Sequence, residues 1–315
     1  MTAPHVARHF LRDDDLDPAE QAEVLELGLA LRADRFAQRP LAGPRAVAII
    51  FDKPTLRTQV SFTAGVAELG GYPLLVDGNL ARIGVRESVA DTARVLGPQV
   101  AAVVWRTHAQ SRIEEMAAHA GVPVVNALTD DFHPCQILAD LLTLAQHWGG
   151  VGALRGRTFA YAGDGSNNMA QSYLLGGATA GLHVRIATPA AYLPSADVVA
   201  RAAEIAATTG GSVVVTDDLA EAVTGADAVA TDTWVSMGQE DEAAEREQPF
   251  VPYRLDAAAV ALAAPGALVL HCLPAYRGKE ITAEVLDGPQ AVVWDEAENR
   301  LHAQKALLTW LLERS

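Results

Sequence analysis

Short apolar runs alternate along the chain with stretches whose apolar residues recur at helical spacing. Residues 46–51 are almost entirely apolar, which is typical of a strand buried on both faces of a parallel sheet. Phe62, Val66 and Leu69 follow at i, i+4 and i+7, so this stretch is predicted to form a helix with one apolar face. Further strands are expected at residues 72–76, 100–105, 122–126, 158–162, 183–188, 212–216, 228–231, 267–270 and 291–294. Strands that alternate with helices predict parallel βαβ units in an α/β protein.

The turn after the first strand has the features of an anion site. Thr55 stands where a helix N-cap is expected, so the backbone N–H groups of Leu56, Arg57 and Thr58 would point out of a helix N-terminus. The Arg57 guanidinium and the Thr58 hydroxyl add side-chain donors, and an arginine fork matches phosphate oxygens. An ordinary βα turn with a solvated Arg57 explains the same residues equally well, so both interpretations stay open.

Polar side chains follow the ends of several predicted strands. They belong to the turns at residues 106–108, 232–234, 271–274 and 295–296. Ligands of open α/β sheets bind outside the carboxyl ends of the strands, so these turns are expected to form a site. Residues 77–88 are polar and lack a hydrophobic period, which predicts a loop of the kind that often carries function.

A dinucleotide site is one alternative, because Gly163-Asp164-Gly165 follows a strand and precedes a predicted helix. The third glycine position of that fingerprint holds Asn168, and the next strand is followed by no acid for a ribose. A tight βα turn, or a small polar ligand held by Asn167 and Asn168, explains the stretch better than NAD.

The cysteines and histidines suggest other chemistry only weakly. His133-x-Cys135 and His271-Cys272 match no usual zinc spacing, and no acyl-transfer signature surrounds Cys272 as a nucleophile. His133 precedes a predicted helix, where a histidine tends to stay neutral and can donate a hydrogen bond to a carbonyl group.

Charge and composition narrow the class of partner. The formal net charge of −15 argues against nucleic acid and membrane surfaces as partners. No apolar run reaches transmembrane length, and the first residues contain no apolar core of a secretory signal. Cys135 and Cys272 are far apart and form no disulfide framework. We therefore expect a soluble, cytoplasmic protein.

Seven motifs together resemble the aspartate/ornithine carbamoyltransferase family. They are FDKPTLRT, VVWRT, FHPCQILADL, GDGSNNMAQS, DTWVSMGQE, HCLPA and WDEAENRLHAQKALL, in the family's order and over nearly the whole chain. HPCQ, DTWVSMG and HCLPA are similar to the ornithine branch, whereas the aspartate branch has no SMG-type motif and a basic acceptor loop.

The resemblance implies a role for each motif, without a metal or an organic cofactor. Carbamoyl phosphate would be bound by Thr55, Leu56, Arg57, Thr58, Arg82, Arg106, His133, Gln136, Cys272, Leu273 and Arg300. Ornithine would be bound by Asn168, Asp232, Ser236, Met237 and Cys272. Arg57, Arg106, His133, Gln136, Cys272 and Arg300 would be catalytic. Preorganised donors of this kind stabilise a carbonyl oxygen on which negative charge develops.

The resemblance also implies two doubly wound parallel-sheet domains. Residues 1–148, joined by the returning C-terminal helix at 300–315, would bind carbamoyl phosphate, and residues 149–299 would bind ornithine. The family forms a homotrimer in which a neighbour's loop completes each site. Residues 77–88 match that loop, with Arg82 as the residue that would reach across, although a surface loop within one subunit remains an alternative.

The chain departs from the family's pattern at the anion site. The family usually has S-T-R-T-R where this chain has Thr55-Leu56-Arg57-Thr58-Gln59, Gln or His at the position of Arg82, and, in close bacterial relatives, His at Tyr276. The expected activity is transfer of a carbamoyl group from carbamoyl phosphate to the δ-amine of L-ornithine, giving L-citrulline and phosphate for arginine biosynthesis. A carbamoyltransferase for a related amine or an acylated ornithine, or a non-catalytic paralogue, is the alternative.

Overall fold

The computed structural model describes residues 7–235 and 247–315, which divide into two compact units. Unit 1 comprises Met1–Leu142 and Glu298–Ser315, and unit 2 comprises Thr143–Ala297. The division falls inside two continuous helices, α6 (Pro134–Trp148) and α13 (Val293–Glu313), and not at the glycines after residue 148, where the sequence predicts it. Within the described part of the chain, no helix is long and apolar enough to cross a membrane.

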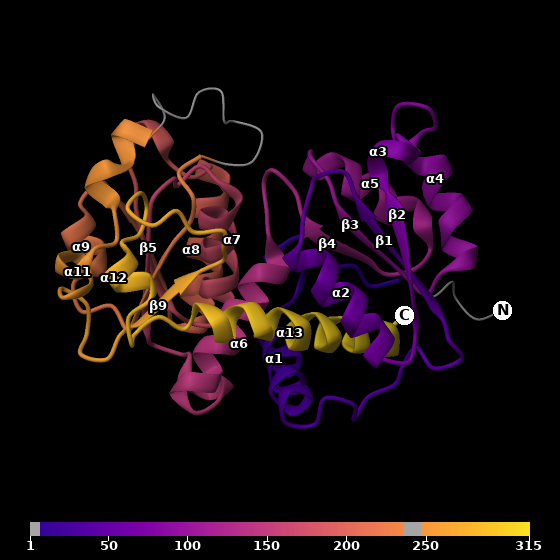
Figure 1. The fold of residues 1–315 in the computed structure, drawn as a ribbon, viewed down its shortest axis with the longest axis horizontal. Helices are drawn as coiled ribbons and strands as arrows, with labels where there is room; N and C mark the ends of the chain where they lie inside the picture. Colours follow the sequence, from indigo (N-terminus) through magenta and orange to yellow (C-terminus); the bar gives the residue numbers. More distant parts are fainter. Residues whose placement is uncertain (1–6, 236–246) are drawn as a thin grey trace. The chain divides into compact units, whose positions relative to one another are not determined.

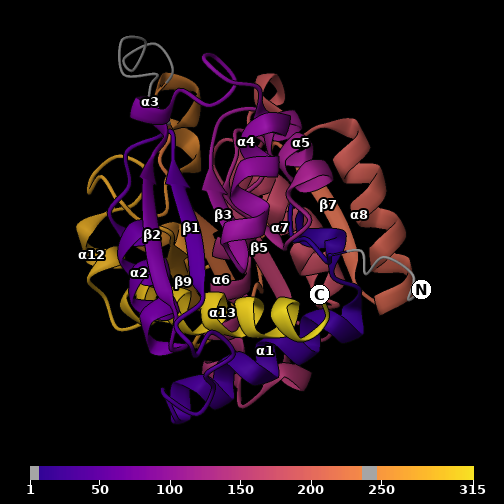
Figure 2. The ribbon, with the colours of Figure 1, turned by 90° about the vertical axis from the view of Figure 1, so that its right-hand side faces the viewer.

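Unit 1 is built on a parallel sheet of four strands in the order β2-β1-β3-β4 (Figure 1). Its remaining elements, in chain order, are α1 (Pro18–Ala33), β1 (Ala46–Phe51), α2 (Arg57–Glu68), β2 (Tyr72–Asp77), α3 (Gly78–Ala81), α4 (Val89–Leu96), β3 (Ala102–Arg106), α5 (Gln110–Ala120) and β4 (Val124–Leu128). Figure 2 shows β2, β1 and β3 running side by side. The chain leaves β1 toward β2 but resumes on the other side of β1 at β3, which makes the β1/β3 boundary the topological switch point of this sheet.

Helices cover both faces of the unit 1 sheet, which explains why its strands are mostly apolar. Ala48 and Ile50 of β1 pack with Ile113 and Met116 of α5 in one core, to which α4 also contributes. The other face meets α2, which contacts β1 and β2. Residues 301–311 of α13 are all buried, including Lys305, whose ammonium pairs with Glu68 at 2.8 Å. A lysine can be buried in this way because the ion pair replaces its hydration.

Unit 2 contains a parallel sheet of five strands in the order β7-β6-β5-β8-β9. Its elements are β5 (Thr158–Ala162), α7 (Asn168–Thr179), β6 (His183–Ala187), α8 (Ala196–Thr209), β7 (Ser212–Thr216), α9 (Leu219–Val223), β8 (Ala228–Thr231), α11 (Ala257–Val260), β9 (Leu268–His271) and α12 (Ala283–Leu286). Side chains of α9, α11 and α12 pack together on one face of the sheet. Helix α7 contacts β5 and β6, and α8 contacts β7. The switch point lies between β5 and β8.

The prediction of two doubly wound parallel sheets is confirmed, but two local predictions are wrong. Residues 291–294 do not form a strand: Ala291 makes one isolated bridge to Val269, and α13 begins at Val293. A short apolar run cannot be assigned to a strand or a helix by its period, and the acids Asp295 and Glu296 that follow are typical of a helix's first turn. The predicted loop at residues 77–88 contains one helical turn, α3.

Candidate active site

The anion site predicted after β1 lies at the N-terminus of α2. The helix begins at Arg57, and its N-cap is Leu56, not Thr55 as the sequence suggested; the Leu56 backbone is already helical. Among the described residues no side chain caps this end of α2, so its first turn presents the positive end of the helix dipole. Arg57 is half-buried and Thr58 is buried, and both stand at this end.

Arg106 is brought next to this helix end by the sheet. It is the last residue of β3 and pairs in register with Phe51, the last residue of β1. The Asp52 N–H donates to the Arg106 carbonyl oxygen at 2.9 Å, which extends the pairing by one residue. The Arg106 side chain is 4% exposed. A buried guanidinium therefore lies at the β1/β3 switch point, where the fold favours a ligand.

Arg300 joins the same site from α13. Its Nη2 donates to the Thr58 hydroxyl at 2.7 Å and its Nη1 donates to Gln136 Oε1 at 2.6 Å. All three side chains are buried. Gln136 in turn donates from Nε2 to the carboxylate of Asp140 at 2.8 Å. The structure thus brings Arg300 next to Thr58, which is 242 residues earlier in the chain, and next to Gln136, which is 164 residues earlier.

His133 is held in its neutral form within this cluster. Burial lowers its pKa well below 6.5, and the positive charges of Arg300, Arg106 and Arg57 lower it further. A neutral imidazole can donate one hydrogen bond to a carbonyl oxygen without adding a further charge. Cys135, two residues on, is buried, and burial raises the pKa of its thiol to about 12. Cys135 is therefore a packing residue whose thiol stays protonated at neutral pH.

Arg82 lies on the segment after β2, exposed and with a backbone φ of +48°. The base of this segment is fixed by Arg112 of α5, a residue that the sequence analysis missed. Arg112 Nη2 donates to the Ile83 carbonyl oxygen at 2.9 Å and pairs with Asp52, and Arg112 Nε donates to the Thr107 hydroxyl at 3.0 Å. Nothing in the sequence around Arg112 distinguishes it from a solvated helix residue.

Unit 2 carries its own polar cluster beside its switch point. Asp232 follows β8 and Cys272 follows β9, and the thiol donates to Asp232 Oδ1 at 3.2 Å. Burial raises the pKa of Asp232 above 3.8, although His271 and the Thr233 N–H act in the opposite direction. Asn168 is the first residue of α7 and is half-buried. Asn167 is the N-cap of α7, with its side chain engaged by the Ala170 N–H, which makes its role structural.

The turn after β9 is fixed by a buried histidine. Leu273 has a φ of +59°, a conformation that costs a residue other than glycine about 1–2 kcal/mol. Its N–H donates to His271 Nδ1 at 2.9 Å, so Nε2 must carry the ring proton and faces Glu280 at 3.2 Å. Glu296 accepts from the His271 N–H at 2.9 Å. These bonds define the direction of the Leu273 carbonyl and the place of Cys272.

Asp232, His271 and Cys272 offer ligand atoms within 4.8 Å of one another. The geometry does not suit a metal ion, because both His271 nitrogens already have partners and the Cys272 thiol donates to Asp232. Ser236 and Met237, predicted to bind ornithine, lie outside the described residues.

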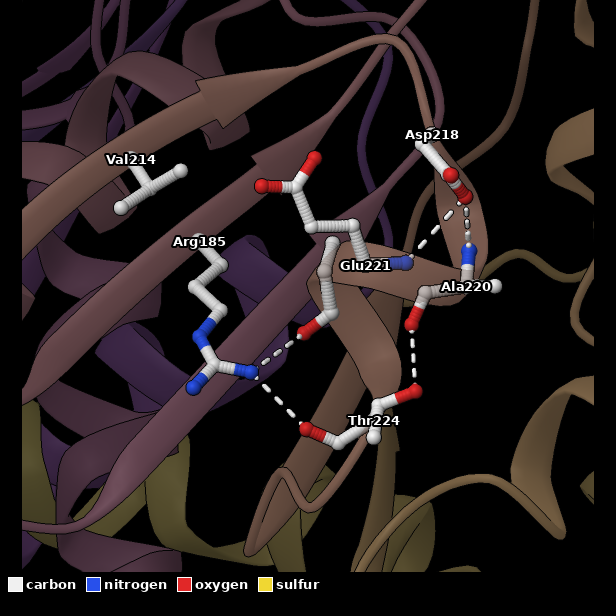
Figure 3. A pocket seen from close by; sticks show the side chains of 7 residues that line it. Arg185, Val214, Asp218, Ala220, Glu221 and Thr224 are labelled. Atoms are coloured by element: carbon white, nitrogen blue, oxygen red, sulfur yellow. Dashed lines mark hydrogen bonds between the residues drawn. The ribbon is translucent and has the colours of Figure 1, made fainter.

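A separate surface cavity of about 660 Å³ lies in unit 2 beside β6, β7 and α9, and none of its lining residues follows β8 or β9 (Figure 3). Arg185 of β6 and Glu221 of α9 are among its lining residues. Arg185 Nη1 donates to the carbonyl oxygens of Ala222 and Thr224 at 3.3 and 2.9 Å, which ties β6 to the end of α9. These hydrogen bonds give Arg185 a structural role. We therefore place the candidate site at the ends of β1 and β3 in unit 1 and of β8 and β9 in unit 2.

Comparison with known proteins finds two matching domains in this chain. The carbamoyl-P binding domain of aspartate/ornithine carbamoyltransferase matches residues 8–146, and the Asp/Orn binding domain matches residues 155–311. The ornithine carbamoyltransferase of Bifidobacterium longum (strain NCC 2705) is 63% identical over 304 residues, 96% of this chain and 95% of that protein. The enzyme of Clavibacter sepedonicus is 62% identical over 310 residues, 98% of this chain and 100% of that protein.

A solved structure agrees with these sequence matches. Ornithine carbamoyltransferase from Pyrococcus furiosus superposes with a TM-score of 0.92 at 40% identity, covering 99% of both chains. The similarity thus extends over both units and not over a single motif. The chain belongs to the aspartate/ornithine carbamoyltransferase family.

Proposed function

We propose that the protein transfers the carbamoyl group of carbamoyl phosphate to the δ-amine of L-ornithine, giving L-citrulline and phosphate. The observation that carries the proposal is the division of charge between the two switch points. Unit 1 gathers Arg57, Arg106 and Arg300 around a neutral His133, whereas unit 2 offers the carboxyl of Asp232 beside Cys272. One substrate is an anion and the other carries an α-ammonium group. Arginine biosynthesis in the cytoplasm is the setting that this activity implies.

In unit 1, the phosphate would be bound at the N-terminus of α2 by backbone N–H groups of residues 55–58 and by the Arg57 and Arg106 guanidinium groups. This is the arrangement in which helix dipole and arginine forks favour a phosphate together. His133 and Arg300 would donate to the carbamoyl oxygen, and Gln136 would accept from the carbamoyl amide. These donors gain strength as the carbonyl oxygen becomes negative, which is how they lower the barrier.

In unit 2, the α-amino end of ornithine would pair with Asp232 and contact Asn168, and Ser236 and the Met237 backbone would complete that end. The δ-amine would lie near Cys272. The Leu273 carbonyl, directed by the strained turn, would accept from the carbamoyl amide. The raised pKa of Asp232 means that its carboxyl is poorly solvated, so an ammonium group would gain much from pairing with it.

The reaction forms one bond and breaks one. The neutral δ-amine attacks the carbamoyl carbon, its C–N bond forms, and the C–O bond to phosphate breaks with both electrons leaving on phosphate. The proton that the amine loses can pass to the departing phosphate. Holding amine and carbonyl in line supplies most of the acceleration, together with stabilisation of the oxyanion and the leaving group.

The geometry argues against the alternative acceptors. An acylated ornithine has no α-ammonium, which would leave the carboxylate of Asp232 without its counter-charge in a poorly solvated place. A diamine has no α-carboxylate for the donors around Asn168. A non-catalytic paralogue would have no reason to retain the buried Arg300, Gln136 and Thr58 connection.

A homotrimer is part of the same proposal. Unit 1 exposes large apolar side chains on α2, on the edge strand β2 and on residues 78–88. They are Leu56, Val60, Tyr72, Leu75, Leu80 and Val85, with exposed fractions of 46% to 78%. A sheet edge with exposed apolar residues is usually covered in a functional assembly. Arg82 lies in this region and would complete the anion site of a neighbouring subunit.

A colorimetric ureido assay with carbamoyl phosphate and a panel of amines tests the proposed activity. The panel should contain L-ornithine, N-acetyl-L-ornithine and putrescine. Product with ornithine alone supports the proposal; product with another member selects that alternative, and no product with any member favours the non-catalytic paralogue. Mass by light scattering tests the trimer. Mixing Arg57→Ala and Arg82→Glu variants should restore activity if Arg82 acts on a neighbour, because some mixed sites then contain both arginines.

A further inference from the structure

Asp140 is a buried carboxylate that neither the motif roles nor the proposed mechanism uses. It lies on α6, one helical turn after Gln136, and its side chain is 1% exposed. Its Oδ1 accepts a hydrogen bond from Gln136 Nε2 at 2.8 Å. Burying a carboxylate is costly, so its place next to a substrate-binding amide requires an explanation.

The partners of Gln136 determine how its amide is oriented. On one side stands a carboxylate, which only accepts, and on the other stands the Arg300 guanidinium, which only donates. If the amide were turned over, its oxygen would face the carboxylate of Asp140 and its NH₂ group would face Arg300 Nη1. Both hydrogen bonds would then become repulsive contacts between buried groups, and leaving such groups unsatisfied is costly.

We propose that Asp140 is a positioning residue that makes Gln136 present an acceptor, and thereby selects a donor substrate that carries an NH₂ group. The inference rests on the proposed function, because it concerns the carbamoyl end of the same substrate. In this structure Gln136 Oε1 accepts a hydrogen bond from Arg300 Nη1 at 2.6 Å. When the carbamoyl donor binds, its carbonyl oxygen accepts a hydrogen bond from the Arg300 N–H, and its amide N–H donates a hydrogen bond to Gln136 Oε1.

Discrimination between an amide and a methyl group of equal size follows from this arrangement. A site built to accept an N–H rejects a ligand that lacks it, because the buried acceptor is left without a partner. Without Asp140, the amide of Gln136 can turn over, and the preference for NH₂ is lost. The phosphate end, at the N-terminus of α2, does not depend on Asp140.

Two stable phosphonates measure this preference directly. Phosphonoacetamide carries an NH₂ group where 2-oxopropylphosphonate carries a methyl group, and methylphosphonate reports the phosphate end alone. Their dissociation constants should be measured by titration calorimetry on wild type, Asp140→Leu and Asp140→Asn, with Asp91→Asn, an exposed carboxylate on α4, as the control. We expect the amide-to-methyl preference to fall about tenfold in Asp140→Leu, the value of one lost hydrogen bond. Methylphosphonate affinity should be unchanged.

Asp140→Asn keeps an acceptor and the same volume, so it should retain part of the preference and serves if the leucine variant does not fold. A merely structural role for Asp140 would weaken all three ligands alike. In a Gln136→Leu background the Asp140 substitution should have no further effect on the preference. An unchanged preference in both Asp140 variants would overturn the inference while wild type still makes citrulline. Wild type that binds none of the phosphonates and makes no citrulline would instead refute the proposed function.

Discussion

The two switch points of this chain follow one topological rule and carry opposite charge. In unit 1 the ends of β1 and β3 gather buried arginines around a histidine whose pKa is lowered. In unit 2 the ends of β8 and β9 gather a carboxyl whose pKa is raised and a thiol that donates to it. The parallel sheet provides the location in both cases. The few side chains after each strand determine which ligand the location can bind.

The largest effect should come from removing the cation at the N-terminus of α2. Arg57→Ala should reduce citrulline formation by about 10²- to 10³-fold or more, because phosphate anchoring and charge stabilisation are lost together. Steady-state kinetics and thermal unfolding should be compared with those of Arg39→Ala, which removes an exposed arginine of the same unit. Activity within a few-fold of wild type would show that unit 1 does not bind the anionic substrate here.

The carboxyl of unit 2 should affect only the other substrate. Asp232→Asn removes the charged partner of the α-ammonium, so ornithine affinity should fall about 10- to 100-fold. Carbamoyl phosphate binding should change little. Calorimetric titration of each substrate separately measures both values, with Asp256→Asn, an N-cap of α11 in the same unit, as the control. Equal losses for both substrates would contradict the division of charge.

A smaller effect is expected where unit 1 departs from its family's pattern. Arg82→Gln should raise the Michaelis constant for carbamoyl phosphate about tenfold, because in the proposed trimer this exposed arginine would form the charged hydrogen bond that Leu56 and Gln59 do not supply. Leu56→Thr combined with Gln59→Arg should largely rescue that loss. Additive effects, with no rescue in the combined variant, would refute compensation between Arg82 and the anion site.

In unit 1, His133 should make the free energy of unfolding rise with pH. The folded-state pKa of His133 is well below 6.5, so between these two values the unfolded chain binds more protons. The His133 contribution is therefore fully present above pH 6.5 and is lost as pH falls toward the lowered pKa, by at most about 1.4 kcal/mol per pH unit. Urea unfolding at several pH values should show a shallower slope for His133→Gln, and equal slopes would contradict it.

Asp232 should give the opposite sign in unit 2. Its folded-state pKa is raised above 3.8, so the folded chain binds more protons in the interval between the two values. Its contribution to the free energy of unfolding is fully present below pH 3.8 and is lost as pH rises through the raised pKa. The same urea series on Asp232→Asn should lose this part of the profile. If the wild-type contribution of Asp232 to the free energy of unfolding instead rose with pH, as that of His133 does, the Asp232 pKa would be lowered in the folded chain.

The sequence predicted the architecture because buried strands and helices differ in length and period. The runs predicted as strands at residues 158–162 and 212–216 match β5 and β7 residue for residue. The run at residues 291–294 failed because it is too short to show a period and borders a helix start. Thr55 failed as an N-cap because the turn continues in helical geometry through Leu56.

The candidate site was predictable only in part for a different reason. Arg106 ends a strand, and Arg57 and Asp232 stand in the turns or helix starts after strands, so their positions can be read from the pattern. Arg300 lies within a helix far along the chain, and its bonds to Thr58 and Gln136 depend on packing that periodicity does not reveal. Asp140 left one signal in the sequence, a charged residue within the otherwise mostly apolar stretch 137–145 of α6.

The contrast between the two cysteines gives the protein a built-in chemical reporter. Cys135 is buried and its thiol is held protonated, with a pKa of about 12, whereas Cys272 is partly accessible and its sulfur contacts Asp232. Thiolates, not thiols, attack alkylating reagents, so labelling of the folded chain should occur at Cys272 alone. An amine that binds beside Asp232 and Cys272 should slow this labelling, so the labelling rate would report its binding, whether or not the amine reacts, without engineering a probe into the chain.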